Sequence, residues 1–118
     1  MFLVYNKNMI ENILGNVTAE KVLLSLLHYG QGYTRAIAQD FNIAETPVRK
    51  QLERFEDAGV IHSKLIGRTR LYTFNKKSPY TKPLMSLLEV AYKAIPLKKR
   101  EKIFSTRRRP RRKGKPVL

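Results

Sequence analysis

The side chains best suited to chemistry occupy the stretch AETPVRKQLERFEDA at residues 44–58. At 100° per residue, a helix through this stretch presents a cationic, hydrogen-bonding face that begins in its first turn. Arginine and lysine can bind phosphates, and together with threonine they can hydrogen-bond base edges in the major groove of DNA. The residues predicted to contact a duplex from this helix are Thr46, Pro47, Arg49, Lys50 and Arg54.

A second group of cations follows at the tip of a predicted β-hairpin. Residues 60–66 and the run LYTF at 71–74 favour two strands, and GRTR at 67–70 favours the turn between them. A hairpin tip beside the basic helix would lie over the neighbouring minor groove or phosphates, although a merely solubilising turn is the alternative. The predicted contacts from the hairpin are Lys64, Arg68, Thr69 and Arg70.

Both groups need a scaffold, and the basic helix has clear positioning signals. Thr46 can accept a hydrogen bond from free N–H groups, and Pro47 lacks the N–H that would be unpaired there, so the helix is predicted to begin at Thr46. Its apolar residues recur at i, i+4 and i+7 and should face a core. These residues are Val48, Leu52 and Phe55.

Shorter helices are predicted upstream. Asn8 and Glu11 have the spacing of a capping box, and Thr18 is placed to cap the next helix. A short helix over 34–41 (TRAIAQDF) and a brief turn then precede the basic helix, which matches the helix-turn-helix pattern. Many helical hairpins show this pattern without binding DNA, and it is the basic β-hairpin that favours a DNA-binding interpretation.

An amphipathic helix is predicted after the linker KKSPYTKP, over about residues 80–95. Its apolar stripe could pack on the chain's own core. Because the stripe is long for a helix that only caps a small domain, we favour a homodimer seam that presents two basic helices to a pseudo-palindromic site. The predicted seam consists of Leu84, Leu87, Leu88, Ala91, Tyr92 and Ile95.

The net charge of +15 is concentrated at the C-terminal end. Residues 98–115 hold eleven Lys or Arg against one acid, which leaves thirteen against eight elsewhere. We therefore divide the chain into a domain at 1–97 and a basic, flexible arm at 98–118 that has too few apolar residues to fold alone. Such a charge favours nucleic acid as partner, and the arm lacks the apolar surface that a membrane anchor needs. The arm contacts are assigned to Arg107, Arg108, Arg109, Arg111, Arg112 and Lys113. The alternatives for the arm are a basic tail without a single target and a nuclear-import signal.

The remaining composition argues against an enzyme or a metalloprotein. The chain has no cysteine, its two histidines are far apart, and it has no glycine-rich phosphate loop or nucleophile paired with a base. We predict no metal site, no cofactor and no catalysis, and a structural or solvent-facing role for His28. The apolar start MFLVY is too short for a signal peptide, so we expect a cytoplasmic protein, associated with the nucleoid if the host is bacterial.

The order of elements resembles that of the ArsR-like winged helix-turn-helix transcriptional regulators. The resemblance covers roughly residues 10–95 and is carried by IAQDFNIAETPVRKQLERFEDAGVI, GRTRLYTFN and KSPYTKPLMSLLE. It implies a mainly α fold with a small β-hairpin (α+β), a winged helix-turn-helix with an extra C-terminal helix. By position it also implies base and phosphate contacts from Thr46, Pro47, Arg49 and Lys50, and contacts from Arg68 and Arg70 on the wing. Metal sensing in this family uses cysteines or clustered His and carboxylates, and it does not carry over.

Three functions are consistent with these features. The leading hypothesis is a homodimeric, sequence-specific regulator of transcription that binds double-stranded DNA, with repression as the expected mode. The second is an architectural chromatin protein or a structural RNA-binding protein, which keeps RNA as a candidate partner. The third is an interaction module that partners an enzyme and whose basic surface is incidental.

Overall fold

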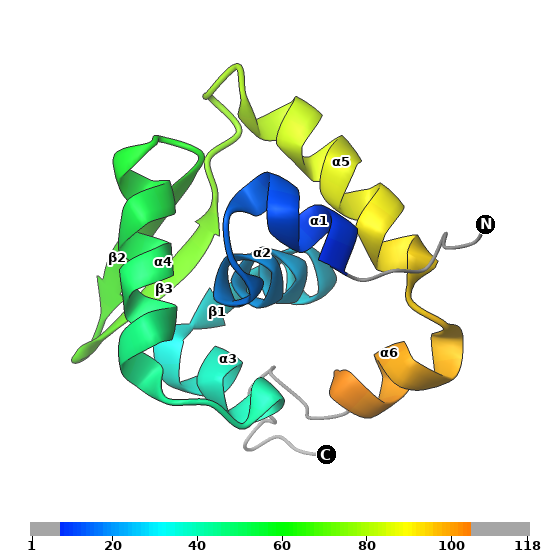
Figure 1. Cartoon of the computed structure of the whole chain (residues 1–118). Coiled ribbons are helices and arrows are strands. Elements are labelled where there is room, and N and C mark those ends of the chain that lie inside the picture. Colours follow the sequence, from blue (N-terminus) through cyan, green and yellow to red (C-terminus); the bar gives the residue numbers. More distant parts are fainter. Residues whose placement is uncertain (1–7, 105–118) are drawn as a thin grey trace, which may run out of the picture.

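Residues 8–104 are the part of the chain that the computed structural model describes, and they form six α-helices and a small three-stranded antiparallel sheet (Figure 1). The prediction of a mainly helical α+β fold is confirmed at this level. In chain order the elements are α1 (Asn8–Leu14), α2 (Val17–Tyr29), β1 (Gln31–Tyr33), α3 (Thr34–Phe41), α4 (Glu45–Asp57), β2 (Ile61–Ile66), β3 (Thr69–Phe74), α5 (Thr81–Ala94) and α6 (Leu97–Ile103).

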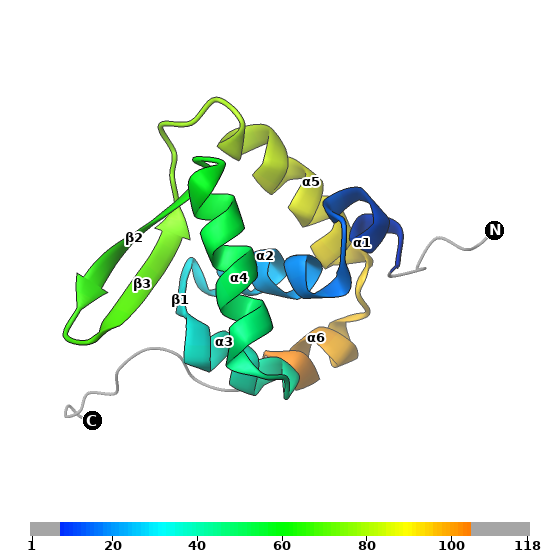
Figure 2. The ribbon, with the colours of Figure 1, turned by 60° about the vertical axis from the view of Figure 1, so that its left-hand side comes forward.

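Helix α2 lies at the centre, with the other helices and the sheet around it (Figures 1 and 2). Its residues 22–26 are buried in succession, as expected for a helix that is covered on most sides. The cap of α2 differs from the prediction. The Asn16 side chain accepts a hydrogen bond from the backbone N–H of Ala19 at 2.7 Å, so Asn16 caps the helix and Thr18 lies inside its first turn.

Helix α4 packs against α2 and α3 through the predicted stripe. Val48, Leu52 and Phe55 are all buried, which confirms that part of the prediction. The predicted start at Thr46 is wrong by one residue, because α4 begins at Glu45 with Ala44 in the capping position and no side-chain cap. Thr46 and Pro47 therefore lie in the first turn, where backbone N–H groups have no partner within the helix.

The sheet has the strand order β1-β3-β2, so both β1 and β2 are edge strands. The hairpin β2–β3 closes through the two residues Gly67 and Arg68, and Gly67 has the positive φ of 62° that such a turn requires. Strand β1 was not predicted. Its Gly32 pairs with Tyr72, and a Cβ at Gly32 would lie only 3.2 Å from the Ile37 side chain, so the close approach of α3 requires glycine here.

The C-terminal part of the described chain is more ordered than predicted. The amphipathic helix is present as α5, but a further helix, α6, follows it, and Phe104 directly after α6 is buried with 7% of its surface exposed. The boundary between domain and arm at residues 97 and 98 is therefore wrong, and the folded part extends at least to Phe104. The predicted arm contacts at residues 107–113 lie outside the described residues.

Candidate nucleic-acid interface

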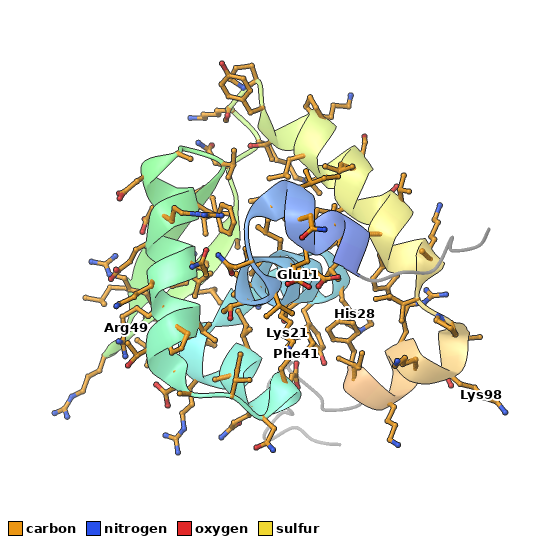
Figure 3. The ribbon with its side chains drawn as sticks, viewed as in Figure 1. Glu11, Lys21, His28, Phe41, Arg49 and Lys98 are labelled. Atoms are coloured by element: carbon orange, nitrogen blue, oxygen red, sulfur yellow. The ribbon has the colours of Figure 1, made fainter. Side chains whose placement is uncertain are left out.

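The first half of α4 presents its polar side chains outward. Because Val48 and Leu52 hold one side of the helix against the core, Thr46, Pro47, Arg49 and Lys50 are exposed. Figure 3 shows Arg49 on the outer side of α4, away from α2. Within residues 8–104, no hydrogen bond or ion pair of the chain engages Arg49 or Lys50. Their donors are free to bind an anion or a base edge.

Arg54 differs from the other predicted contacts of α4. Its Nη2 donates a hydrogen bond to the backbone carbonyl of Leu14 at 2.9 Å, and its guanidinium lies over the Phe55 ring at 4.7 Å from the centroid. It also lies about 140° around the helix from Arg49. The structure therefore separates Arg54 from Arg49 and directs it to the junction of α1 and α2.

The hairpin divides its four predicted contacts among different faces. Pairing within the sheet places Arg70 opposite Leu65, on the face of Ser63 and Tyr72, whereas Lys64 lies opposite Leu71 on the other face. Thr69 shares the face of Lys64, and its Oγ1 donates to the Ile66 carbonyl at 3.1 Å, across the turn. Arg68 lies in the turn itself and is exposed. Only Arg70 and Arg68 are therefore placed on the α4 side or at the tip.

A polar bridge joins the hairpin to α4. Arg70 Nη1 donates to Ser63 Oγ at 3.2 Å, and Ser63 Oγ donates to Glu56 Oε2 at 2.8 Å. These bonds fix the orientation of Arg70 and of the hairpin base relative to α4.

The electrostatics around Tyr72 show which charges share this space. Burial raises the pKa of the Tyr72 hydroxyl above its usual 10.0, and the carboxylates of Glu56 and Glu53 raise it further. The guanidinium groups of Arg70 and Arg49 oppose this increase in the pKa. Arg49 on α4 and Arg70 on β3 therefore act on the same region between helix and hairpin.

The sequence reasoning missed two features of this side of the molecule. Arg35 is exposed in the first turn of α3, the helix that packs against α4, and its position in the short helix before the basic one was the available signal. In addition, residues 58–88 contain six Lys or Arg and no acid, although the chain as a whole has nine acids. The hairpin and the following linker are therefore uniformly positive.

The predicted dimer seam is largely used inside the chain. Leu88 is fully buried, so its side chain is not available to a second copy, and the prediction for this residue is wrong. Leu84, Ala91, Tyr92 and Ile95 are half-buried and pack against the core, and Leu87 is half-buried as well. The large apolar residues that remain exposed nearby are Val90 on α5 and Ile13 on α1.

His28 belongs to an aromatic cluster that holds α6. Its ring stacks on Phe104 with 4.4 Å between centroids, and its Nδ1 lies 2.7 Å from the Tyr92 hydroxyl. Desolvation lowers the pKa of His28 below 6.5, Arg100 lowers it further and Asp40 opposes the shift. The cluster explains His28 as a structural residue, in line with its predicted role.

No group of three or more His, Cys, Asp or Glu side chains within residues 8–104 is arranged to hold a metal ion. The helices in that range are also all too short or too polar to cross a membrane. Comparison of the chain with family models, with curated proteins and with solved structures found no match. An inference of function therefore depends on the residues of this chain and their geometry.

Proposed function

We propose that this chain is a winged helix-turn-helix protein that binds double-stranded DNA sequence-specifically and regulates transcription as a homodimer, with repression as the expected mode. One observation carries the proposal. The first turns of α4 present exposed, unengaged polar side chains, and Arg49 among them converges with Arg70 of the hairpin. A helix that contacts base edges with its N-terminal residues needs this arrangement.

The proposed mechanism assigns a different contact to each element. Helix α4 enters the major groove, where Arg49 and Lys50 can bind guanine acceptors and the exposed Glu45 can accept a hydrogen bond from cytosine. Helix α3 crosses the backbone, and Arg35 binds a phosphate there. The hairpin lies over the adjacent minor groove or backbone with Arg68 and Arg70.

The resemblance to ArsR-like regulators supports the same arrangement through its order of elements. The proposal carries over neither metal sensing nor catalysis, and in a bacterial host the protein would act on the nucleoid in the cytoplasm. The homodimer is retained with a revised seam, because Val90 and Ile13 remain exposed where much of the predicted stripe is buried. Residues 105–118 would add phosphate contacts that depend little on sequence.

Selection of bound duplexes from a random pool at near-physiological salt tests the proposal. We expect enrichment of a pseudo-palindromic motif, and we expect Arg49→Ala or Lys50→Ala to relax the preference at one or two positions in each half-site. Lys98→Ala is the matched control, since Lys98 is an exposed cation on α6 that Figure 3 shows far from Arg49.

Two outcomes would replace the proposal with an alternative. Equal affinity for unrelated duplexes, or tighter binding to structured RNA, would favour an architectural or RNA-binding protein. A stoichiometric protein partner together with no measurable duplex affinity would favour the interaction module.

A further inference from the structure

The tip of the hairpin β2–β3 exposes two adjacent large apolar side chains. Leu65 is 61% exposed and Ile66 is 42% exposed, and they are the last two residues of β2 before the Gly67–Arg68 turn. Single exposed apolar residues are ordinary on protein surfaces. Two in succession at the end of a projecting hairpin, beside Lys64 and Arg68, form a distinct feature that the contacts proposed above do not use.

The pairing register places these two side chains on opposite faces of the tip. Leu65 lies opposite Arg70, and Ile66 lies opposite Thr69. Arg70 is held toward Ser63 by its hydrogen bond, and Thr69 is held by its bond to the Ile66 carbonyl. The polar partners are thus directed to the chain itself, and the apolar side chains flank the turn.

The charge around the tip favours a polyanionic partner over an apolar protein surface. Residues 58–88 contain no acid, and three of their six cations, Lys64, Arg68 and Arg70, lie on the hairpin. The tip also points to the same side of the molecule as the N-terminal end of α4 (Figures 1 and 2). An element that binds DNA next to a helix in the major groove meets the adjacent minor groove.

The dimensions of the minor groove decide which part of the tip could enter it. The groove is about 6 Å wide in B-DNA, whereas two paired strands are already about 4.8 Å apart before their own atoms and side chains are added. The hairpin backbone must stay outside, and only side chains that project from the tip can reach the floor. Apolar side chains in this position contact sugars and base edges and can open a base step.

We propose that Leu65 and Ile66 form a minor-groove wedge that binds A·T-rich duplex DNA beside the site read by α4, with Arg68 entering the same groove. This inference rests on the proposed function. A·T pairs are favoured because their minor groove lacks the exocyclic amino group of guanine, which would obstruct an apolar side chain. A-tracts also have a narrow groove whose negative potential attracts arginine.

A base analogue that alters only the minor groove tests this wedge. In the duplex obtained by selection, A·T pairs flanking the α4 site are replaced by diaminopurine·T pairs, which add an amino group in the minor groove and leave the major groove unchanged. We expect the full-length protein to bind the substituted duplex roughly tenfold more weakly. The double variant Leu65→Ala, Ile66→Ala should bind the unmodified duplex roughly tenfold more weakly than the parent and should be insensitive to the added amino group.

Two further variants separate the wedge from indirect effects. Leu97→Ala is the matched control, because Leu97 is also a leucine, is 60% exposed and lies on α6; it should leave affinity and analogue sensitivity unchanged. Leu65→Gln keeps the side-chain length but not its apolar character, and it should lose affinity as Leu65→Ala does. Thermal unfolding should be the same for all variants, since the substituted side chains are exposed.

The outcomes distinguish this inference from the proposed function. If a motif is selected and depends on Arg49, but the parent protein is insensitive to diaminopurine, the wedge is overturned and the proposed function stands. If no duplex is enriched, both fail. If Leu65→Ala instead changes the oligomeric state in sedimentation without changing DNA affinity, the tip is a contact between copies through the β2 edge, and the wedge is again overturned.

Discussion

Two basic regions of this molecule use their cations in opposite ways. On the side of α4 and the hairpin, Arg49, Lys50 and Arg68 are exposed and unengaged within residues 8–104. On the side of α5 and α6, Arg100 donates from Nε to the Ile95 carbonyl at 3.1 Å and lies over the Tyr92 ring at 4.7 Å. The second arrangement stabilises the fold. Charge density alone therefore does not identify a binding surface, and what matters is whether the chain already uses the cation.

Arg54 shows that the distinction applies even within one helix. It lies five residues after Arg49, yet it contacts the Leu14 carbonyl and the Phe55 ring. Its assignment as a DNA contact stays a prediction, and its observed contacts indicate a structural role.

The largest expected effect concerns the end of the folded region. Removing residues 98–118 takes away α6 and Phe104 and should lower the free energy of unfolding by about 3–5 kcal/mol, the usual cost of truncating a buried phenylalanine. Removing only 105–118 should leave this free energy unchanged and should weaken binding to all duplexes, with a flatter salt dependence. Chemical denaturation and binding at several salt concentrations measure the two effects. Equal stability of the two truncations would contradict the structural role of Phe104.

Arg49 and Arg100 provide the direct comparison between the two regions. Arg49→Ala should reduce discrimination against a mismatched base by about 1–3 kcal/mol, because a bidentate contact to guanine is lost. Arg100→Ala should leave discrimination unchanged. Affinities for the selected duplex and for single-base variants measure the difference. A loss of discrimination in Arg100→Ala as large as in Arg49→Ala would show that the comparison is wrong.

A smaller effect is expected at Arg54. Arg54→Ala should lower the free energy of unfolding by about 0.5–1.5 kcal/mol through loss of the hydrogen bond to Leu14, with unchanged base discrimination. Lys50→Ala on the same helix is the control, and it should change discrimination without changing stability. Thermal unfolding and duplex affinities are the measurements. If the two variants exchanged these effects, Arg54 would belong to the interface.

The smallest effect is a pH dependence from His28. Because the pKa of His28 is lowered in the folded chain, the unfolded chain takes up a proton first, and stability should fall as the pH drops below about 6.5 toward the folded pKa. Replacing His28 with Phe should flatten this dependence while keeping an aromatic stack on Phe104. Denaturant titrations of both proteins between pH 8 and 5 measure it. An identical slope in the variant would assign the dependence to other groups.

Much of the candidate site could be predicted because its signals are local. The stripe Val48, Leu52 and Phe55 follows from helical periodicity, and a Gly-containing turn between two β-rich runs indicates the hairpin. The opposite faces of Lys64 and Arg70 depend on the exact register, in which one residue of slip reverses every side chain. Neighbouring residues do not fix that register.

The sequence by itself determined the mainly helical α+β class, the buried stripe of α4 and the concentration of charge, because these follow from periodicity and composition. Only the tertiary structure decided which cations remain free, since Arg54 and Arg100 find their partners on segments that composition cannot place beside them. It also decided that β1 pairs with β3, that Leu88 is buried within the chain and that Phe104 stacks on His28. Each of these contacts joins residues distant in sequence, so its free energy depends on the packing of the whole domain.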